Sequence, residues 1–191
     1  MTEEQSIKLS DTSANPAPLG LAAFALTTIL LNLHNAGLYP MDTMIMAMGI
    51  FYGGIAQVIA GYMEWKKNNT FGTIAFTSYG FFWISLVSFI VFPKFGMGDG
   101  PTPASKASFL AIWGIFSLFL FVATLKLSKA LRVVFFLLVV LFALLVAATI
   151  TESHTLHVVA GFEGLLCGFS ALYAGMAQVI NEVYKRNILP L

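Results

Sequence analysis

The chain has little charge: Asp, Glu, Lys and Arg together make up 10% of its 191 residues. Soluble domains usually carry about 25% of such residues, so this scarcity excludes an ordinary soluble domain. The net charge of +1 leaves no concentrated basic face, which argues against a nucleic-acid partner. The single cysteine, Cys167, excludes an internal disulfide and a cysteine-based zinc site.

The N-terminus also lacks the pattern of a signal peptide, which begins basic and then turns apolar. Residues 1–14 are polar, and Glu3, Glu4 and Asp11 outweigh Lys8. We expect residues 1–14 to form a flexible cytoplasmic tail and residues 15–191 to form one membrane domain.

Apolar residues are abundant instead: 58% of the chain is hydrophobic, and the mean hydropathy is +0.84. A helix of about 20 apolar residues spans a bilayer. The alternation of a membrane β-strand is absent. The sequence therefore predicts an all-α integral membrane protein with six transmembrane helices, at about 19–37, 42–64, 71–92, 107–125, 132–150 and 155–181.

The basic residues indicate the orientation of these spans. Eight Lys and Arg flank the ends on the side of the N-terminus, whereas Lys94 and Lys106 flank the opposite ends. Because cytoplasmic loops are enriched in Lys and Arg, both termini are predicted to be cytoplasmic.

A weak internal repeat relates the second span to the sixth. Residues 51–59 (FYGGIAQVI) match residues 172–180 (LYAGMAQVI) at six positions. One interpretation is three helical hairpins around a pseudo-threefold axis. The other is chance similarity between helices rich in small residues, which pack closely in membranes.

The stretch NPAPLGL, from Asn15 to Leu21, opens the first span. Asn15 is a suitable N-cap, and Pro16 fits the first helical position. The start of a helix attracts anions, so Asn15 is a candidate for the entry of a carboxylate, or else a helix cap alone.

The same stretch is similar to the signature of the acetate uptake transporter family, the succinate–acetate permeases of microbes. The resemblance runs from about Asn15 to about Leu189 and includes four further blocks, TILLNLHN, AMGIFYGGIAQ, NTFGTIAFTSYG and VLFALL. It implies a plasma-membrane permease or channel for acetate and related short carboxylates, succinate among the candidates. It also implies a homo-oligomer, a hexamer with one pore within each protomer.

Matching blocks carry the family's site residues onto this chain. The resemblance implies a hydrophobic constriction formed by Phe24, Tyr79 and Leu138, and an influence of Ala171 on the size of the substrate. An apolar collar can exclude water and still admit a solute that has a methyl group.

Polar residues within the predicted spans are the remaining pore candidates. They either hydrogen-bond neighbouring helices or line the solute path, because unpartnered polar groups are costly at membrane depth. These residues are Thr27, Thr28, Asn32, Asn35, Thr77 and Ser78. Trp83 and Trp113 also fall deep in their spans, where they either pack or line the path.

Few ionisable groups lie at membrane depth. Glu163 falls within the sixth span and is a candidate for proton coupling, or faces an aqueous vestibule instead. Glu152, His154 and His157 are too few for a zinc site, so we expect neither metal nor cofactor.

The leading hypothesis is a carboxylate permease. The alternatives are the same scaffold transporting another small solute, such as ammonium, and a non-transporting carboxylate receptor. We do not expect an enzyme, because the chain has neither an H-E-x-x-H nor a G-x-S-x-G motif.

Overall fold

The computed structural model describes residues 13–191, and within that range the chain is helical, without a β-strand. The predicted tail of residues 1–14 therefore lies almost entirely outside the described residues. The elements, in chain order, are α1 (Ala17–Asn35), α2 (Thr43–Ala47), the π-helix η1 (Met48–Ala56), α3 (Gln57–Lys66), α4 (Thr70–Val91), the 3-10 helix η2 (Phe92–Phe95), α5 (Pro103–Thr124), α6 (Lys129–Thr151) and α7 (His154–Tyr184).

Six helices within residues 13–191 are long and apolar enough to cross a membrane, which confirms the predicted fold class. Two of the six are composite, because α2, η1 and α3 run on as Thr43–Lys66 and α4 continues into η2 as Thr70–Phe95. Each predicted span overlaps one of these helices. The largest difference is at the fourth span, which begins at Pro103 and was predicted from residue 107.

Polar caps explain why several helices begin before their apolar runs. Thr102 Oγ1 accepts a hydrogen bond from Ser105 N at 3.2 Å, and Ser128 Oγ accepts one from Leu131 N at 3.3 Å. Each cap satisfies a free N–H group of the first turn. The first turn itself is polar, so hydropathy alone places the start of the helix too late.

The predicted cap of α1 is wrong by one position. Pro16, with φ −82° and ψ −16°, is the N-cap residue, and α1 begins at Ala17. Pro16 has no N–H to be capped, and Asn15 Oδ1 instead accepts from Ala17 N at 3.1 Å. Asn15 therefore still satisfies a donor of the first turn.

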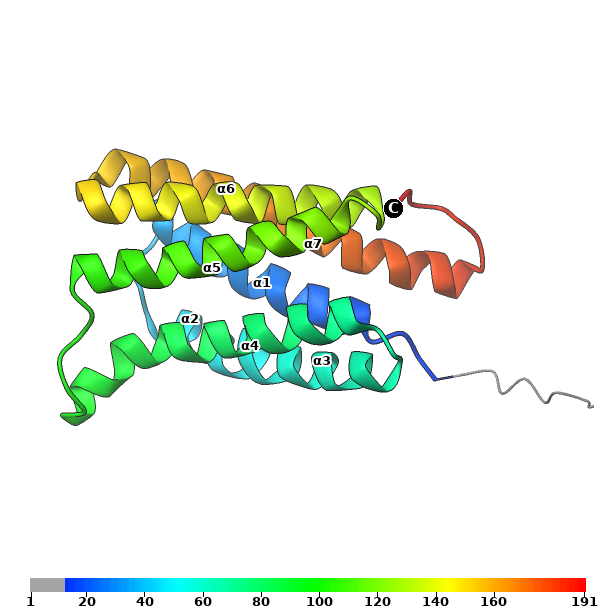
Figure 1. The fold of residues 1–191 in the computed structure, drawn as a ribbon, viewed down its shortest axis with the longest axis horizontal. Helices are drawn as coiled ribbons and strands as arrows, with labels where there is room; N and C mark the ends of the chain where they lie inside the picture. The colour runs from blue at the N-terminus through cyan, green and yellow to red at the C-terminus, as the bar shows by residue number, and fades with distance from the viewer. Residues whose placement is uncertain (1–12) are drawn as a thin grey trace, which may run out of the picture.

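The helices lie lengthwise in a single bundle, with the described N-terminal segment and the C-terminus at the same end (Figure 1). The connections from α4 to α5 and from α6 to α7 lie at the opposite end. Within the bundle, α1 packs extensively on α7, α3 on α4, and α6 on both α5 and α7.

The glycines of α7 form the seam with α1. A Cβ atom on Gly161 or Gly164 would collide with Asn35–Ala36 or with the side chain of Asn32, and one on Gly168 would lie 2.6 Å from Ile29 Cγ1. The stripe of small residues therefore allows close helix packing.

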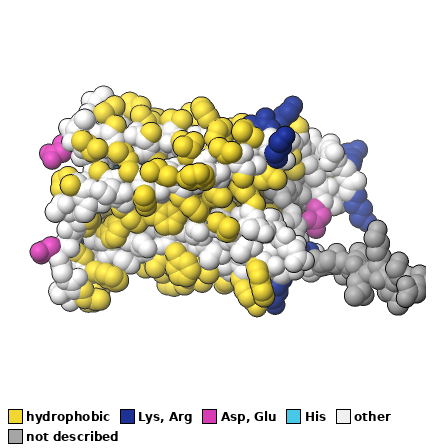
Figure 2. Space-filling model, viewed as in Figure 1, with side chains coloured by type: hydrophobic (Ala, Val, Ile, Leu, Met, Phe, Trp, Pro, Cys, Tyr) yellow, Lys and Arg dark blue, Asp and Glu magenta, His cyan; other side chains and the backbone are white. Residues whose placement is uncertain are grey.

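Charge is concentrated at the ends of the bundle. Figure 2 shows Lys and Arg gathered at the end that carries the termini, with hydrophobic side chains covering the flank between the two ends. This distribution is typical of a membrane-spanning bundle. That the termini face the cytoplasm stays a prediction.

The π-helix η1 is the element that sequence patterns did not indicate. Its glycines lie against other helices, since a Cβ atom on Gly53 would be 2.8 Å from Thr27 Oγ1 and one on Gly54 2.7 Å from Ile84 Cγ1. Short π-helical segments often occur at functional sites. Here η1 packs between α1 and α4, two helices that line the cavities described next.

Candidate functional site

Two cavities lie inside the bundle, one toward each end. The distal cavity, toward the end opposite the termini, has a volume of about 330 Å³ and includes His34, Asn35 and Lys106 in its lining. The proximal cavity, toward the termini, has a volume of about 230 Å³ and includes Asn15 and Gln178.

The two cavities share three lining residues, Phe24 of α1, Tyr79 of α4 and Leu138 of α6. We call these three residues the collar. Their side chains are 7%, 3% and 4% exposed. The collar therefore stands between the cavities and is predominantly apolar.

The Tyr79 ring is fixed at the collar from two sides. Its hydroxyl lies 2.8 Å from Ser117 Oγ on α5, and its ring centroid lies 5.9 Å from that of Phe24. Ser117 Oγ in turn donates to Trp113 O at 2.7 Å. Because Ser117 uses its own proton on a backbone carbonyl, the Tyr79 hydroxyl donates to Ser117.

Polar groups of α1 and α7 line one wall of the distal cavity. Asn32 Nδ2 donates to Thr28 O at 2.9 Å, and Asn35 Nδ2 donates to Asn32 Oδ1 at 3.0 Å. His157 Nε2 lies 3.2 Å from Asn35 Oδ1 and joins α7 to this chain of side chains. These bonds fix the amide orientations on that wall.

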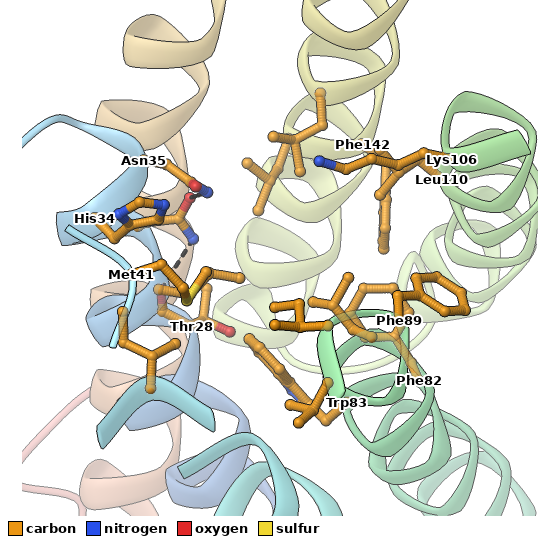
Figure 3. Close-up of a pocket in the computed structure, with 18 of the residues that line it drawn as sticks. Thr28, His34, Asn35, Met41, Phe82, Trp83, Phe89, Lys106, Leu110 and Phe142 are labelled. Carbon is orange, nitrogen blue, oxygen red and sulfur yellow. Dashed lines mark hydrogen bonds between the residues drawn. The ribbon is translucent and has the colours of Figure 1, made fainter. Parts of the chain in front are cut away.

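Lys106, in the first turn of α5, lies across the cavity from that wall. Figure 3 shows its side chain extending toward the side of His34 and Asn35. Lys106 is exposed and also lines the cavity, so it places a positive charge at the distal mouth. Apart from it, the lining of the distal cavity contains no Lys or Arg.

Amides line the proximal cavity. Asn15 Nδ2 donates to Gln178 Oε1 at 2.9 Å, and Asn69 Nδ2 donates to Glu64 Oε2 at 2.7 Å. Gln57 is 1% exposed, and its Oε1 has no hydrogen-bond partner among the described residues. Gln57 and Gln178 occupy the same position of the internal repeat.

Three of the polar residues considered for the path lie elsewhere. Thr27 is fully buried and donates to Met48 O at 3.4 Å, so it joins α1 to η1. Thr77 faces Gly61 of α3. Neither of these, nor Ser78, is among the residues that line the two cavities.

Ala171 and Glu163, both on α7, also lie off the two cavities. Ala171 is fully buried in the core, so an effect on substrate size would act through packing. Glu163 is partly buried, and neither carboxylate oxygen has a hydrogen-bond partner within residues 13–191. Their predicted roles stay predictions.

His34 and His157 take part in hydrogen bonds, with Tyr39 O at 2.9 Å and Asn35 Oδ1 at 3.2 Å. Within the part of the chain that the structure describes, no three His, Cys, Asp or Glu side chains cluster as a metal site would require. Glu152 ends α6 in the left-handed region at φ 49°, and His157 contacts Asn35.

Sequence reasoning missed part of the cavity lining. Trp83 lines the distal cavity, while Trp113 packs on Phe82 at 5.2 Å between ring centroids and lines neither cavity. The repeat could have indicated Gln57 and Gln178, because both positions recur on equivalent helices. No pattern in the sequence indicated that Lys106 lines a cavity, because the direction of its side chain depends on the residue at which α5 begins.

Comparisons with known proteins agree with this architecture. Residues 3–188 match the model of the GPR1/FUN34/yaaH family. The chain is 53% identical to the succinate-acetate/proton symporter SatP of Escherichia coli K12, over 93% of this chain and 95% of that protein. A solved structure of the bacterial acetate channel SatP superposes with a TM-score of 0.93 at 52% identity, covering 94% of this chain and 99% of that one.

A more distant relative is the ammonia transport outward protein 2 of Saccharomyces cerevisiae. It is 36% identical over 88% of this chain and 62% of its own length. The resemblance drawn from the signature and the further blocks is thus confirmed. This chain belongs to the GPR1/FUN34/yaaH family.

Proposed function

We propose that this protein is a membrane permease for acetate and related short carboxylates, which cross each protomer through the distal cavity, the collar and the proximal cavity. One observation carries the proposal: the two cavities share Phe24, Tyr79 and Leu138 and no other lining residue. The similarity to proteins named for acetate and succinate supplies the class of solute.

The chemistry of the lining suits a small amphiphilic anion. A collar of apolar side chains disfavours a continuous column of water, yet it accepts the methyl end of acetate. Amides and hydroxyls on both sides of the collar offer hydrogen bonds to the carboxylate. The absence of Lys and Arg from the lining near the collar keeps binding weak enough for release.

Assembly and location belong to the same proposal. We expect a hexamer in the plasma membrane, with a complete path in each protomer. The glycine stripe of α7 is occupied by α1 within the protomer, so subunits must meet through other faces. The exposed phenylalanines of α5 and α7, among them Phe119 and Phe162, are available to a neighbouring subunit or to lipid.

Uptake of labelled acetate by liposomes that contain the purified protein tests the proposal. Uptake above that of empty liposomes is the expected result. Uptake that follows an imposed pH gradient indicates proton coupling, and uptake that depends on the acetate anion alone indicates a passive channel. No uptake, together with measurable acetate binding, would contradict the proposal and favour a receptor.

Ammonium is the second candidate solute, since one relative is named for ammonia transport. Competition separates the two: excess unlabelled acetate, propionate or succinate should reduce the uptake of labelled acetate, whereas ammonium chloride should not beyond an ionic-strength control. Competition by ammonium alone would favour the second candidate.

A further inference from the structure

Three basic residues lie together where the chain turns from α5 into α6. Lys126 is in the turn, and Lys129 and Arg132 lie on the same face of the first turn of α6. Lys126 and Lys129 are exposed, and Arg132 is half-buried. The turn is at the end of the bundle that carries the termini (Figure 1), where Figure 2 shows Lys and Arg side chains gathered. We call these three residues the basic patch.

No acidic residue accompanies the basic patch on its own helical hairpin. The chain has no Asp or Glu between Asp99 and Glu152, and both of these acids belong to connections at the opposite end of the bundle. Lys185 and Arg186, at the same end as the patch, differ in this respect because Glu182 precedes them by three and four residues. The charge of the basic patch is therefore not balanced by its own hairpin.

The start of α6 is also an unfavourable place for cations. The N-terminus of a helix carries a partial positive charge, which repels Lys and Arg in the first turn and attracts an anion. The first turn of α6 contains no acidic residue to offset this repulsion. An anion beside the basic patch would interact favourably with its side chains and with the end of the helix.

A hydrogen bond holds the Arg132 guanidinium across the turn. Arg132 Nη2 donates to Leu125 O at 3.0 Å, and Arg132 Nε has no hydrogen-bond partner within residues 13–191. A guanidinium has five N–H donors, so this bond positions the group and leaves other donors for a ligand. Guanidinium groups bind phosphate through two parallel hydrogen bonds, which makes phosphate the anion that suits Arg132 best.

The surface next to the basic patch is apolar. Val133 and Phe136 continue the face of α6 on which Arg132 lies, and they are 50% and 53% exposed. The ring centroid of Phe136 lies 6.0 Å from that of Phe121, so the apolar surface extends onto α5. Leu127, in the turn itself, is 43% exposed. A ligand that covers both parts of this surface has an anionic head and a hydrocarbon tail.

We propose that the basic patch binds the phosphate of an anionic phospholipid, whose acyl chain lies on the adjoining apolar surface of α6. Clusters of Lys and Arg beside a transmembrane helix attract such headgroups. Phosphatidylglycerol has the required chemistry, whereas phosphatidylcholine brings a cation of its own to the patch. A neighbouring copy offers little charge to pair with the patch, because Glu182 is the only exposed acid at this end among the described residues.

Two double variants with equal loss of charge test the proposal. Lys129→Gln/Arg132→Gln removes two charges from the patch, and Lys185→Gln/Arg186→Gln removes two charges outside it at the same end. Native mass spectrometry of the detergent-purified protein, titrated with phosphatidylglycerol, measures the dissociation constant. The patch variant should raise this constant about 25-fold, since each cation near the membrane surface contributes about fivefold. The control variant should stay within about twofold of the wild type.

A second measurement uses the wild-type protein alone. Its thermal unfolding in detergent is followed with phosphatidylglycerol, phosphatidylcholine or inorganic phosphate at the same concentration. Saturating phosphatidylglycerol should raise the unfolding midpoint by about 5 °C, because a ligand that binds only the folded state stabilises it. Phosphatidylcholine and inorganic phosphate should each leave the midpoint within about 1 °C.

Four results would overturn the proposal. Equal stabilisation by the two lipids would show that the charge of the headgroup does not matter. Equal stabilisation by inorganic phosphate and phosphatidylglycerol would identify a site for a free anion. Equal losses in the two double variants would reduce the effect to the general charge of that end. Unchanged lipid binding by Lys129→Gln/Arg132→Gln, together with a smaller oligomer, would assign the patch to contact with a second copy of the chain.

Discussion

At the scale of single residues, Tyr79 combines two functions in one side chain. Its ring packs against Phe24, while its hydroxyl reaches Ser117 on the neighbouring α5. The hydrogen bond fixes the direction of the ring, and the ring fills the space between the cavities. Leu138 forms the third side of the collar and has no hydrogen-bonding group. Truncating its side chain therefore changes only the width of the opening within the collar.

Shortening the collar should widen the range of solutes. We expect Leu138→Ala and Tyr79→Ala to raise the ratio of succinate to acetate uptake by about tenfold, which corresponds to about 1.4 kcal/mol removed from the barrier for the larger solute. Uptake of the two labelled solutes by liposomes with matched protein content measures the ratio.

Phe136→Ala is the control for the collar, because Phe136 lies on α6 two residues from Leu138 and is 53% exposed. The ratio of succinate to acetate uptake by Phe136→Ala should equal that of the wild type. Unchanged selectivity in both collar variants would show that the narrowest point for the solute lies elsewhere.

Gly164 illustrates how one residue supports the polar wall. A Cβ atom there would collide with the side chain of Asn32, which bonds Thr28 O and accepts from Asn35. Gly164→Ala should therefore destabilise the fold by about 1–3 kcal/mol, the usual cost of overpacking. The midpoint of thermal unfolding in detergent measures the effect.

Gly100→Ala provides the comparison for Gly164→Ala. The nearest atom to a Cβ at Gly100 would be Pro93 Cγ at 3.8 Å, an ordinary contact, so this variant should unfold at the wild-type temperature. Equal midpoints for both variants would mean that α1 and α7 can separate at little cost.

The sequence predicted the site residues unevenly. Family blocks identified the collar, and polarity within an apolar span identified Thr28, Asn32 and Asn35. Trp83, Gln57 and Lys106 were missed or left open, because each helix has several faces and hydropathy does not say which face meets the cavity. Thr27, one residue from Thr28, faces η1 instead.

At the scale of elements, the residue at which α5 begins determines where the positive charge of Lys106 lies relative to the distal cavity. Thr102 caps the helix, and Lys106 then lies in its first turn, with its side chain extending toward the side of His34 and Asn35 (Figure 3). Lys94, in η2 at the same end of the bundle, is exposed and lines neither cavity. The two lysines thus have equal charge and different positions relative to the path.

Lys106→Gln should slow acetate uptake from the distal side by about two- to fivefold at 10 mM salt, where charges act over about 30 Å. The difference should shrink at 300 mM salt, because salt screens the attraction. Initial rates at both salt concentrations measure it. Lys94→Gln is the control; an equal loss in both variants would indicate a general surface effect.

Hydropathy was sufficient to predict the six spans but not their internal geometry. The length of each apolar run determines whether it can cross a bilayer, so the number and order of the spans could be predicted directly from the sequence. The π-helix η1 depends on how Gly49, Gly53 and Gly54 fit against α1 and α4, which is a property of tertiary packing. The starts of α1 and α5 depended on single hydrogen bonds to Asn15 and Thr102.

At the scale of the whole molecule, both cavities converge on the collar from opposite ends. The charged side chains visible in Figure 2 gather at the ends of the bundle. Glu163 is the exception, as an acid on α7 at membrane depth. It lies outside the lining of both cavities, and its oxygens have no hydrogen-bond partner within the described chain. A proton carried by Glu163 would therefore be transferred without direct contact with the solute.

Glu163→Gln tests whether this acid couples protons to transport, because the amide keeps the shape and removes the titratable group. Because Glu163 lies outside the lining of both cavities, the substitution should have a small effect. We expect acetate uptake, and its response to an imposed pH gradient, to stay within about twofold of the wild type. Uptake with and without the gradient, in liposomes with equal protein content, provides the comparison. Loss of the gradient response with uptake retained would instead identify Glu163 as the coupling group and require a proton route through α7, separate from the collar.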